Sequence, residues 1–261
     1  MLLKRQPRLN NIPDMTFLDV TNECNDDCQF CYHSSIKGEI KKEDIIKAIQ
    51  EIKSDIILFT GGEPTTREDL FELLAYTKSI GKHPVLTTNG LKLEDINYLK
   101  EINKIGVGIT LSFRDERVIP AMENMLSLGM YHTNSVCISV NNLEEIDDKL
   151  KIAMSFRLLW GDIRLRAILH KPYKKTNLFV SDFITYFFGR YGIENIDQRY
   201  YNNIYHINIV YQNMPIRLIS WPNIMNVDIT ELQCSPFYYP TNENIVLAML
   251  KNWKRTNNAE T

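Results

Sequence analysis

Short apolar runs alternate with amphipathic segments from about residue 16 to about residue 168. The runs are rich in Val, Ile, Leu and Thr and carry few charges, as is typical of parallel strands covered by helices. Between the runs, apolar residues recur at helical spacing, as at Ile45, Ile49 and Ile52. This alternation predicts strands at residues 16–21, 56–60, 84–88, 107–112, 135–140 and 163–168.

Six strands joined by helices imply right-handed crossovers and a parallel sheet. A closed eight-fold barrel usually takes about 250 residues, whereas this run spans roughly 150. We therefore predict an α/β fold with a partial (β/α)6 TIM-like barrel. An open doubly wound sheet has the same periodicity and remains an alternative.

The character of the chain changes after residue 168. Residues 171–261 are rich in Tyr, Asn and Phe, and two strands are predicted at 205–212 and 216–221, with a turn at 213–215. A helix is predicted at 244–253. We expect residues 1–170 to form the partial barrel. Residues 171–261 are then a C-terminal α+β extension that covers the barrel mouth, without being an independent domain.

Charge and hydropathy narrow the class of protein. The chain has 261 residues, 44% of them hydrophobic, and a formal net charge of −2. The near balance of charge gives no support for a nucleic-acid partner. The apolar runs are far too short to span a bilayer, and the N-terminal residues lack the pattern of a signal peptide. We therefore expect a cytoplasmic protein with no membrane partner.

Three of the five cysteines, Cys24, Cys28 and Cys31, fall within eight positions. An odd number of cysteines without an export signal argues against a disulfide framework, so clustered thiols indicate a metal. Electron-transfer clusters normally have four thiolate ligands, whereas a catalytic centre keeps one position open. A structural zinc site with His33 as the fourth ligand is the alternative.

The segment Cys24-Asn25-Asp26-Asp27-Cys28-Gln29-Phe30-Cys31 resembles the signature of the radical S-adenosylmethionine superfamily, Cys-x3-Cys-x2-Cys with an aromatic residue before the last Cys. The resemblance implies one [4Fe–4S] cluster on three thiolates, with S-adenosylmethionine chelating the fourth iron. It also implies reductive cleavage to a 5′-deoxyadenosyl radical that takes a hydrogen atom from a substrate. A flavodoxin- or ferredoxin-like protein is then the expected electron donor, and the cluster is expected to be oxygen-sensitive.

Further motifs follow the next strands in the order that the superfamily requires. Gly61-Gly62-Glu63-Pro64 resembles its GGEP motif, which holds the methionine amino group, and Thr87-Thr88-Asn89-Gly90 ends the third strand. Each motif alone is common turn chemistry, but strand carboxyl ends are where such folds place active sites. The resemblance implies that Phe30 packs beside the cluster and that the backbone around Tyr32 meets adenine. It implies that S-adenosylmethionine is cradled by Gly61, Gly62, Glu63, Thr87, Asn89 and Ser112.

Two cysteines lie outside the triplet. Cys137 lies within a β-run and is expected to be a small buried hydrophobe. Cys234 is a candidate hydrogen-atom donor, because some members of this superfamily use a thiol in that role. Two further cysteines are too few to hold auxiliary iron–sulfur clusters, and we therefore expect one cluster.

The substrate is not encoded in any motif of the sequence. The main hypothesis is a peptide or protein substrate, and the alternative is rearrangement, dehydrogenation or coupling of a small metabolite. A hypothesis from a different class is a non-catalytic zinc or iron–sulfur binding module, which predicts no turnover.

Overall fold

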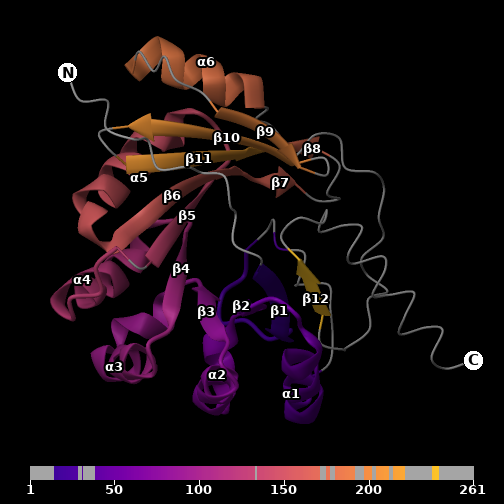
Figure 1. Ribbon diagram of the computed structural model, residues 1–261. Coiled ribbons are helices and arrows are strands. Elements are labelled where there is room, and N and C mark those ends of the chain that lie inside the picture. The colour runs from indigo at the N-terminus through magenta and orange to yellow at the C-terminus, as the bar shows by residue number, and fades with distance from the viewer. Residues whose placement is uncertain are drawn as a thin grey trace, which may run out of the picture.

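One ten-stranded sheet organises the part of the chain that the computed structural model describes (Figure 1). The described residues are 15–28, 31, 39–132, 134–170, 175–176, 180–191, 197–201, 204–211, 214–220 and 237–240. The strand order is β12-β1-β2-β3-β4-β5-β6-β11-β10-β9, and a separate hairpin pairs β7 (Leu169–His170) with β8 (Lys175–Thr176).

The six predicted parallel strands are confirmed. They are β1 (Met15–Thr21), β2 (Ile56–Gly61), β3 (His83–Thr88), β4 (Gly108–Phe113), β5 (Asn134–Val140) and β6 (Trp160–Ala167). Each pairs in parallel with the next. The outer neighbours of this group are β12 and β11 rather than each other. The sheet is therefore not closed, in agreement with a partial TIM-like barrel.

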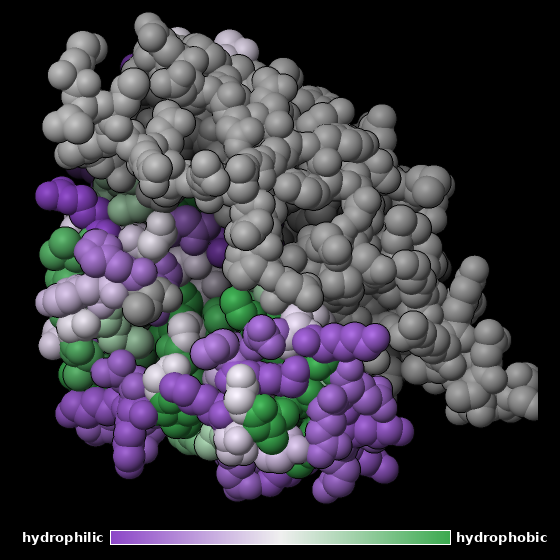
Figure 2. Space-filling view, in the orientation of Figure 1, coloured by the Kyte–Doolittle hydropathy of each residue, from purple (hydrophilic) through white to green (hydrophobic). Residues whose placement is uncertain are grey.

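Five helices join these strands and cover one face of the sheet (Figure 1). They are α1 (Lys42–Glu51), α2 (Leu70–Ser79), α3 (Ile96–Ile105), α4 (Ile119–Ser127) and α5 (Glu144–Ser155). Figure 2 shows hydrophilic side chains over the positions of α1 and α3. None of the helices among the described residues has both the length and the hydropathy of a membrane-spanning segment.

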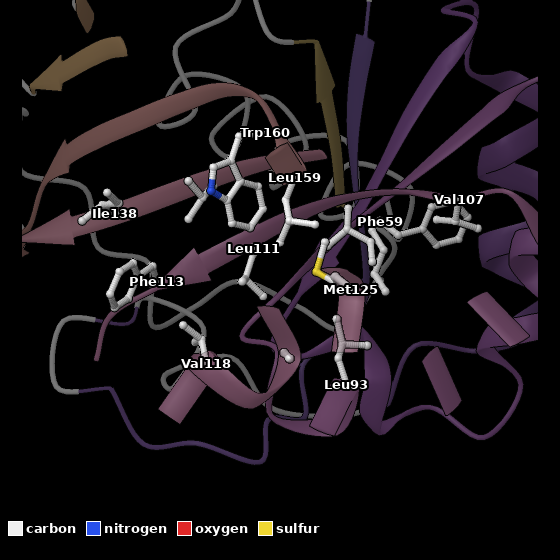
Figure 3. Packing of buried hydrophobic residues seen from close by; sticks show 14 of the residues in the cluster. Phe59, Leu93, Val107, Leu111, Phe113, Val118, Met125, Ile138, Leu159 and Trp160 are labelled. Carbon is white, nitrogen blue, oxygen red and sulfur yellow. The ribbon is translucent and has the colours of Figure 1, made fainter. Parts of the chain in front are cut away.

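The hydrophobic core lies between the sheet and these helices. Phe59 and Leu111 from the strands are fully buried, as is Met125 from α4. Figure 3 shows these side chains lying together with Trp160, whose indole nitrogen donates to the Ala153 carbonyl oxygen at 2.9 Å. This anchoring at the start of β6 explains why the strand begins at residue 160, three residues before its apolar pattern starts.

The opposite face of the β1–β6 sheet, here called the inner face, is layered. The row nearer the amino ends of the strands is largely apolar and aligns Phe17, Leu58, Val85 and Gly108 in register. Nearer the carboxyl ends, Asp19 pairs with Thr60. On the following strands a polar row aligns Thr87, Thr110, Ser135 and Asp162. Barrel interiors are usually filled with bulky branched side chains. The inner face of this sheet instead becomes polar toward the carboxyl ends of its strands.

The described C-terminal elements extend the sheet at both edges. The predicted antiparallel hairpin is confirmed as β10 (Ile204–Tyr211) and β11 (Met214–Ser220), and β11 pairs in parallel with β6. Met214 and Pro215 open β11 instead of lying in the turn, a correction consistent with the tolerance for proline near the start of a strand. β9 (Asp197–Tyr201) flanks β10, and β12 (Phe237–Pro240) pairs antiparallel with β1.

Helix α6 (Val180–Tyr191) joins the outer core, where Phe183 and Phe187 are buried in the same cluster as Ile216 of β11. The predicted helix at 244–253 lies outside the described residues. Coverage of the barrel mouth by residues 171–261 stays a prediction.

Arg67 connects three segments of the chain: the end of β1, the segment before α1 and the segment before α2. Its guanidinium donates to the carbonyl oxygens of Val20 at 2.9 Å and Ile40 at 2.8 Å. It also makes a two-pronged pair with Asp69, at 2.7 Å and 2.8 Å. The Arg67 side chain is 10% exposed, so most of this network is shielded from water.

We expect Asp69→Asn to lower the free energy of unfolding at pH 7 by about 1–3 kcal/mol, because a charge-assisted pair is lost. The hydrogen bond from Arg67 holds the pKa of Asp69 below its usual range. The stability from Asp69 is therefore present above its unfolded pKa of about 3.9 and is lost as the pH falls through the lower folded value.

Urea unfolding from pH 7 to pH 3 checks this expectation. The neighbouring exposed Glu68→Gln is the matched control and should leave the midpoint at pH 7 unchanged. Equal midpoints for Asp69→Asn and Glu68→Gln at pH 7 would contradict the role given to the pair.

Candidate active site

The ends of the first two strands are hydrogen-bonded to each other at the carboxyl edge of the sheet. The backbone N–H of Gly62 donates to the Thr21 carbonyl oxygen at 2.7 Å, and that of Glu63 donates to the Glu23 carbonyl oxygen at 2.7 Å. Cys24 follows immediately along the chain. The segment after β2 therefore fixes the backbone that leads into the cysteine loop.

The two glycines allow this close approach. A Cβ at Gly62 would lie 2.0 Å from the Glu23 carbonyl oxygen, and one at Gly61 would lie 2.3 Å from that of Thr21. Gly61 also has a φ of +127°, which side chains disfavour. The sequence predicts glycines that let carbonyls approach a ligand. In the structure, the space beside both glycines is occupied by the backbone leading to the cysteines.

Glu63 joins the ends of β2 and β3. One carboxylate oxygen accepts from the Thr65 backbone N–H at 3.1 Å and from the hydroxyls of Thr65 and Thr88, each at 2.7 Å. The other accepts from the Asn89 backbone N–H at 2.7 Å. The residue is 2% exposed. Burial raises the pKa of Glu63, and the hydrogen bonds from Asn89, Thr65 and Thr88 act in the opposite direction.

Asn89 continues the network into the cysteine loop. Its side-chain amide donates to the Asn25 side chain at 2.7 Å, between the first two cysteines. Thr87, in contrast, holds a buried hydroxyl with no hydrogen-bond partner among the described residues. Ser112 is half-buried on the inner face at the end of β4. The Asn89 side chain is thus engaged with the cysteine loop, and the predicted contacts of Thr87, Asn89 and Ser112 with S-adenosylmethionine stay predictions.

A charged network connects the loop after β4 to the cysteine loop. Arg114 donates to the Asp26 carboxylate at 2.8 Å and contacts the Cys28 thiol, and Arg117 pairs with Asp26 at 3.2 Å and with Asp115 at 2.8 Å. Burial alone would raise the pKa of Asp26, but the hydrogen bonds from Arg117 and Arg114 hold this pKa below its usual range. The sequence predictions missed this network, because no spacing signal pairs charges so far apart along the chain.

The three cysteines of the motif lie on one loop, and none of them forms a disulfide among the described residues. Cys24 is exposed, while Cys28 and Cys31 are half-buried, and the Cys31 N–H donates to the Cys28 carbonyl oxygen at 2.9 Å. Phe30, Tyr32, His33 and Cys234 lie outside the described residues, so the predictions for them remain predictions.

Among the described ranges, no group of three or more His, Cys, Asp or Glu side chains lies close enough to hold a single metal ion. A [4Fe–4S] cluster takes each thiolate at a different iron, so its ligands do not converge on one point. Three thiolates on one loop, which Asn89 at the end of β3 holds through Asn25, therefore fit a [4Fe–4S] cluster with one open iron.

Cys137 is buried, as predicted, but it lies on the inner face rather than in the apolar core. It stands in register between Ser112 of β4 and Arg164 of β6. Asp19 is also buried on this face, and burial raises its pKa. A sequence signal exists for the polar side chains of β4, β5 and β6, because hydroxyl and charged residues alternate with apolar ones along these strands.

The chain is similar to a known family and to several curated proteins. The model of the Radical SAM superfamily matches residues 18–153. The chain is 40% identical over 100 residues to the 7,8-dihydro-6-hydroxymethylpterin dimethyltransferase of Methanocaldococcus jannaschii, covering 34% of this chain and 20% of that protein. It is 29% identical over 151 residues to a probable GTP 3′,8-cyclase of Saccharolobus islandicus, covering 49% of each. The Fe-coproporphyrin III synthase of Methanosarcina barkeri is 36% identical over 102 residues, covering 36% of this chain and 26% of that protein.

The chain spans about half, or less, of the length of these curated relatives. The family match, in contrast, covers more than half of the chain, from β1 through most of α5, and includes the cysteine loop and the ends of β2, β3 and β4. The chain therefore belongs to the radical SAM superfamily, whose enzymes use S-adenosylmethionine and a [4Fe–4S] cluster held by cysteines.

Proposed function

We propose that this chain is a radical S-adenosylmethionine enzyme that abstracts hydrogen from a small polar metabolite bound at the inner face. The observation that carries the proposal is the hydrogen-bonded junction of the cysteine loop with the ends of β2 and β3, which borders a polar inner face. When bound, the reduced cluster supplies an electron that breaks the C5′–S bond of S-adenosylmethionine, giving methionine and a 5′-deoxyadenosyl radical.

The residues of the chain divide the work in this proposal. Cys24, Cys28 and Cys31 hold the cluster, and Glu63 and Asn89 keep their loop in place through the bonds to Thr88 and Asn25. The glycine segment and the hydroxyls of Thr87 and Ser112 would hold S-adenosylmethionine when it is bound. The polar side chains of β4–β6 would bind the substrate on the inner face. A flavodoxin- or ferredoxin-like protein delivers the electron.

Two observations favour a small metabolite over the peptide of our main sequence-based hypothesis. Polar side chains line the inner face in one row from Thr110 through Ser135 to Asp162, an arrangement suited to a compact ligand with several polar groups. The names of the three relatives refer to a pterin, to GTP and to a coproporphyrin. A peptide substrate remains the alternative.

Anaerobic turnover after reconstitution with iron and sulfide tests the proposal. With dithionite and S-adenosylmethionine, the wild type should hold about four irons and release 5′-deoxyadenosine. Cys28→Ala should lose both, whereas Cys137→Ala, a substitution outside the triplet, should keep its iron. Zinc in place of iron, or 5′-deoxyadenosine from Cys28→Ala at the wild-type rate, would overturn the proposal. The zinc result would favour the non-catalytic module.

A further inference from the structure

Strand β6 directs its charged residues to the inner face. Ile163 and Leu165 are fully buried in the outer core, so the alternate residues Asp162, Arg164 and Arg166 face the other way. All three are half-buried. Two guanidinium groups therefore stand on the face where the proposed function places the substrate.

The two arginines differ in how they are neutralised. Arg164 pairs with Asp162, with Nε 2.9 Å from one carboxylate oxygen and Nη2 3.4 Å from the other, and also donates to the Ser135 hydroxyl at 3.2 Å. Although burial acts against it, the Asp162 carboxylate holds the pKa of Arg164 above its ordinary value. Arg164 is thus a fixed cation with its own counter-ion.

Arg166 has no such counter-ion among the described residues. Its Nη2 donates to the Ser139 hydroxyl at 3.3 Å, and no carboxylate among the described residues forms an ion pair with it. Withdrawing a cation from water is costly unless an anion compensates it. The fork of a guanidinium matches the oxygens of a carboxylate or phosphate in two-pronged geometry. The half-buried Arg166, with Ser139 beside it, is therefore equipped to receive an oxyanion.

Register places this arginine pair beside the proposed S-adenosylmethionine site. Ser112, Cys137 and Arg164 share one row across β4, β5 and β6, so Arg164 lies two strands, or about 10 Å, from Ser112. Ser139 and Arg166 form the next row toward the carboxyl edge. On the far side, β11 places the backbone of Arg217 in register with Arg164.

We propose that Arg166, supported by Arg164 and Ser139, binds a carboxylate or phosphate group of the substrate on the inner face of β5 and β6. This assignment rests on the proposed function, since it names the chemical class of the molecule that the radical attacks. An oxyanion held there fixes one end of the substrate and leaves the rest directed toward Ser112 and the cysteine loop.

Anaerobic isothermal titration calorimetry of the reconstituted, S-adenosylmethionine-bound protein tests this site. Inorganic pyrophosphate and succinate serve as separate probes for phosphate and carboxylate. At least one of them should bind the wild type, and Arg166→Gln should weaken that binding at least tenfold. Arg166→Lys keeps the charge without the fork and should fall between the two. Arg157→Gln, which changes an exposed arginine just before β6, should bind like the wild type.

Three outcomes would overturn the assignment. In the first, neither probe binds the wild type. In the second, Arg166→Gln and Arg157→Gln bind the probes equally well. In the third, Arg166→Gln binds S-adenosylmethionine more weakly while its binding of the probes is unchanged. The last would mean that Arg166 serves the S-adenosylmethionine carboxylate. Release of 5′-deoxyadenosine without substrate, measured on the same preparations, separates the two proposals. If the wild type releases 5′-deoxyadenosine but binds neither probe, only the oxyanion site is refuted. If the wild type releases no 5′-deoxyadenosine, the result counts against the proposed function.

Discussion

Gly62→Ala is expected to prevent iron loading and to lower the free energy of unfolding by about 3 kcal/mol. The added methyl carbon would lie 2.0 Å from the Glu23 carbonyl oxygen and 2.6 Å from its carbonyl carbon. Backbone atoms cannot rotate away as a flexible side chain can, so the segment before Cys24 must move. That movement breaks the bonds that position the cysteine loop. Urea unfolding and iron content after reconstitution check both effects.

Gly189→Ala is the matched control for Gly62→Ala. Gly189 lies in α6 with no atom within 4 Å of an added Cβ, so the substitution should stabilise the helix by about 0.5–1 kcal/mol and leave iron loading unchanged. If Gly62→Ala loaded iron and unfolded like the wild type, the close packing of Gly62 on Glu23 would be refuted.

Glu63→Ala should be nearly as damaging, because it removes the common acceptor of Thr65, Thr88 and Asn89. The hydroxyls can rotate toward other acceptors, but the backbone N–H groups of Thr65 and Asn89 are fixed. Each stranded N–H costs roughly 1–3 kcal/mol, so we expect a loss of about 2–6 kcal/mol and a failure to load iron. Unfolding and iron analysis, with the exposed Glu68→Ala as control, measure these losses.

Glu63→Gln separates charge from shape at the same position. Because burial raises the pKa of Glu63, its contribution to stability is complete below the unfolded value of about 4.3 and is lost as the pH rises through the folded value. The glutamine cannot titrate. The difference in the free energy of unfolding between the wild type and Glu63→Gln should therefore change between the unfolded and the folded pKa of Glu63. A constant difference from pH 4 to pH 8 would show that Glu63 does not titrate there.

Much of the fold follows from the sequence pattern, because each βα unit is specified locally. Apolar alternation and helical spacing are properties of neighbouring residues, so β1 to β5 appear within two residues of their predicted bounds. The start of β6 was missed because Trp160 is anchored by the Ala153 carbonyl oxygen, a contact made with the preceding helix. The docking of β11 on β6 and of β12 on β1 was missed for a similar reason, since pairing between distant strands leaves no local signal.

The site divides in the same way. The cysteine, glycine and Thr-Asn-Gly motifs are short and contiguous, so their order along the chain predicted that they would meet. What each side chain does there was less predictable. Asn89 is engaged with Asn25, and Asp26 is held by Arg114 and Arg117, through contacts that only the folded loops create. Arg166 was missed because no local pattern shows that its partner is the Ser139 hydroxyl and that no carboxylate of the described residues pairs with it.

The pairing of β12 with β1 has a consequence for the order in which the protein is made. β1 leaves the ribosome before the other described strands, yet its outer edge is covered by residues 237–240, more than 200 positions later. Until that segment is synthesised, the strand that leads into the cysteine loop keeps a row of unpaired backbone groups, the kind of edge on which other chains can pair. Growth conditions that slow translation should therefore increase aggregation of the nascent chain before the cysteine loop reaches its final environment.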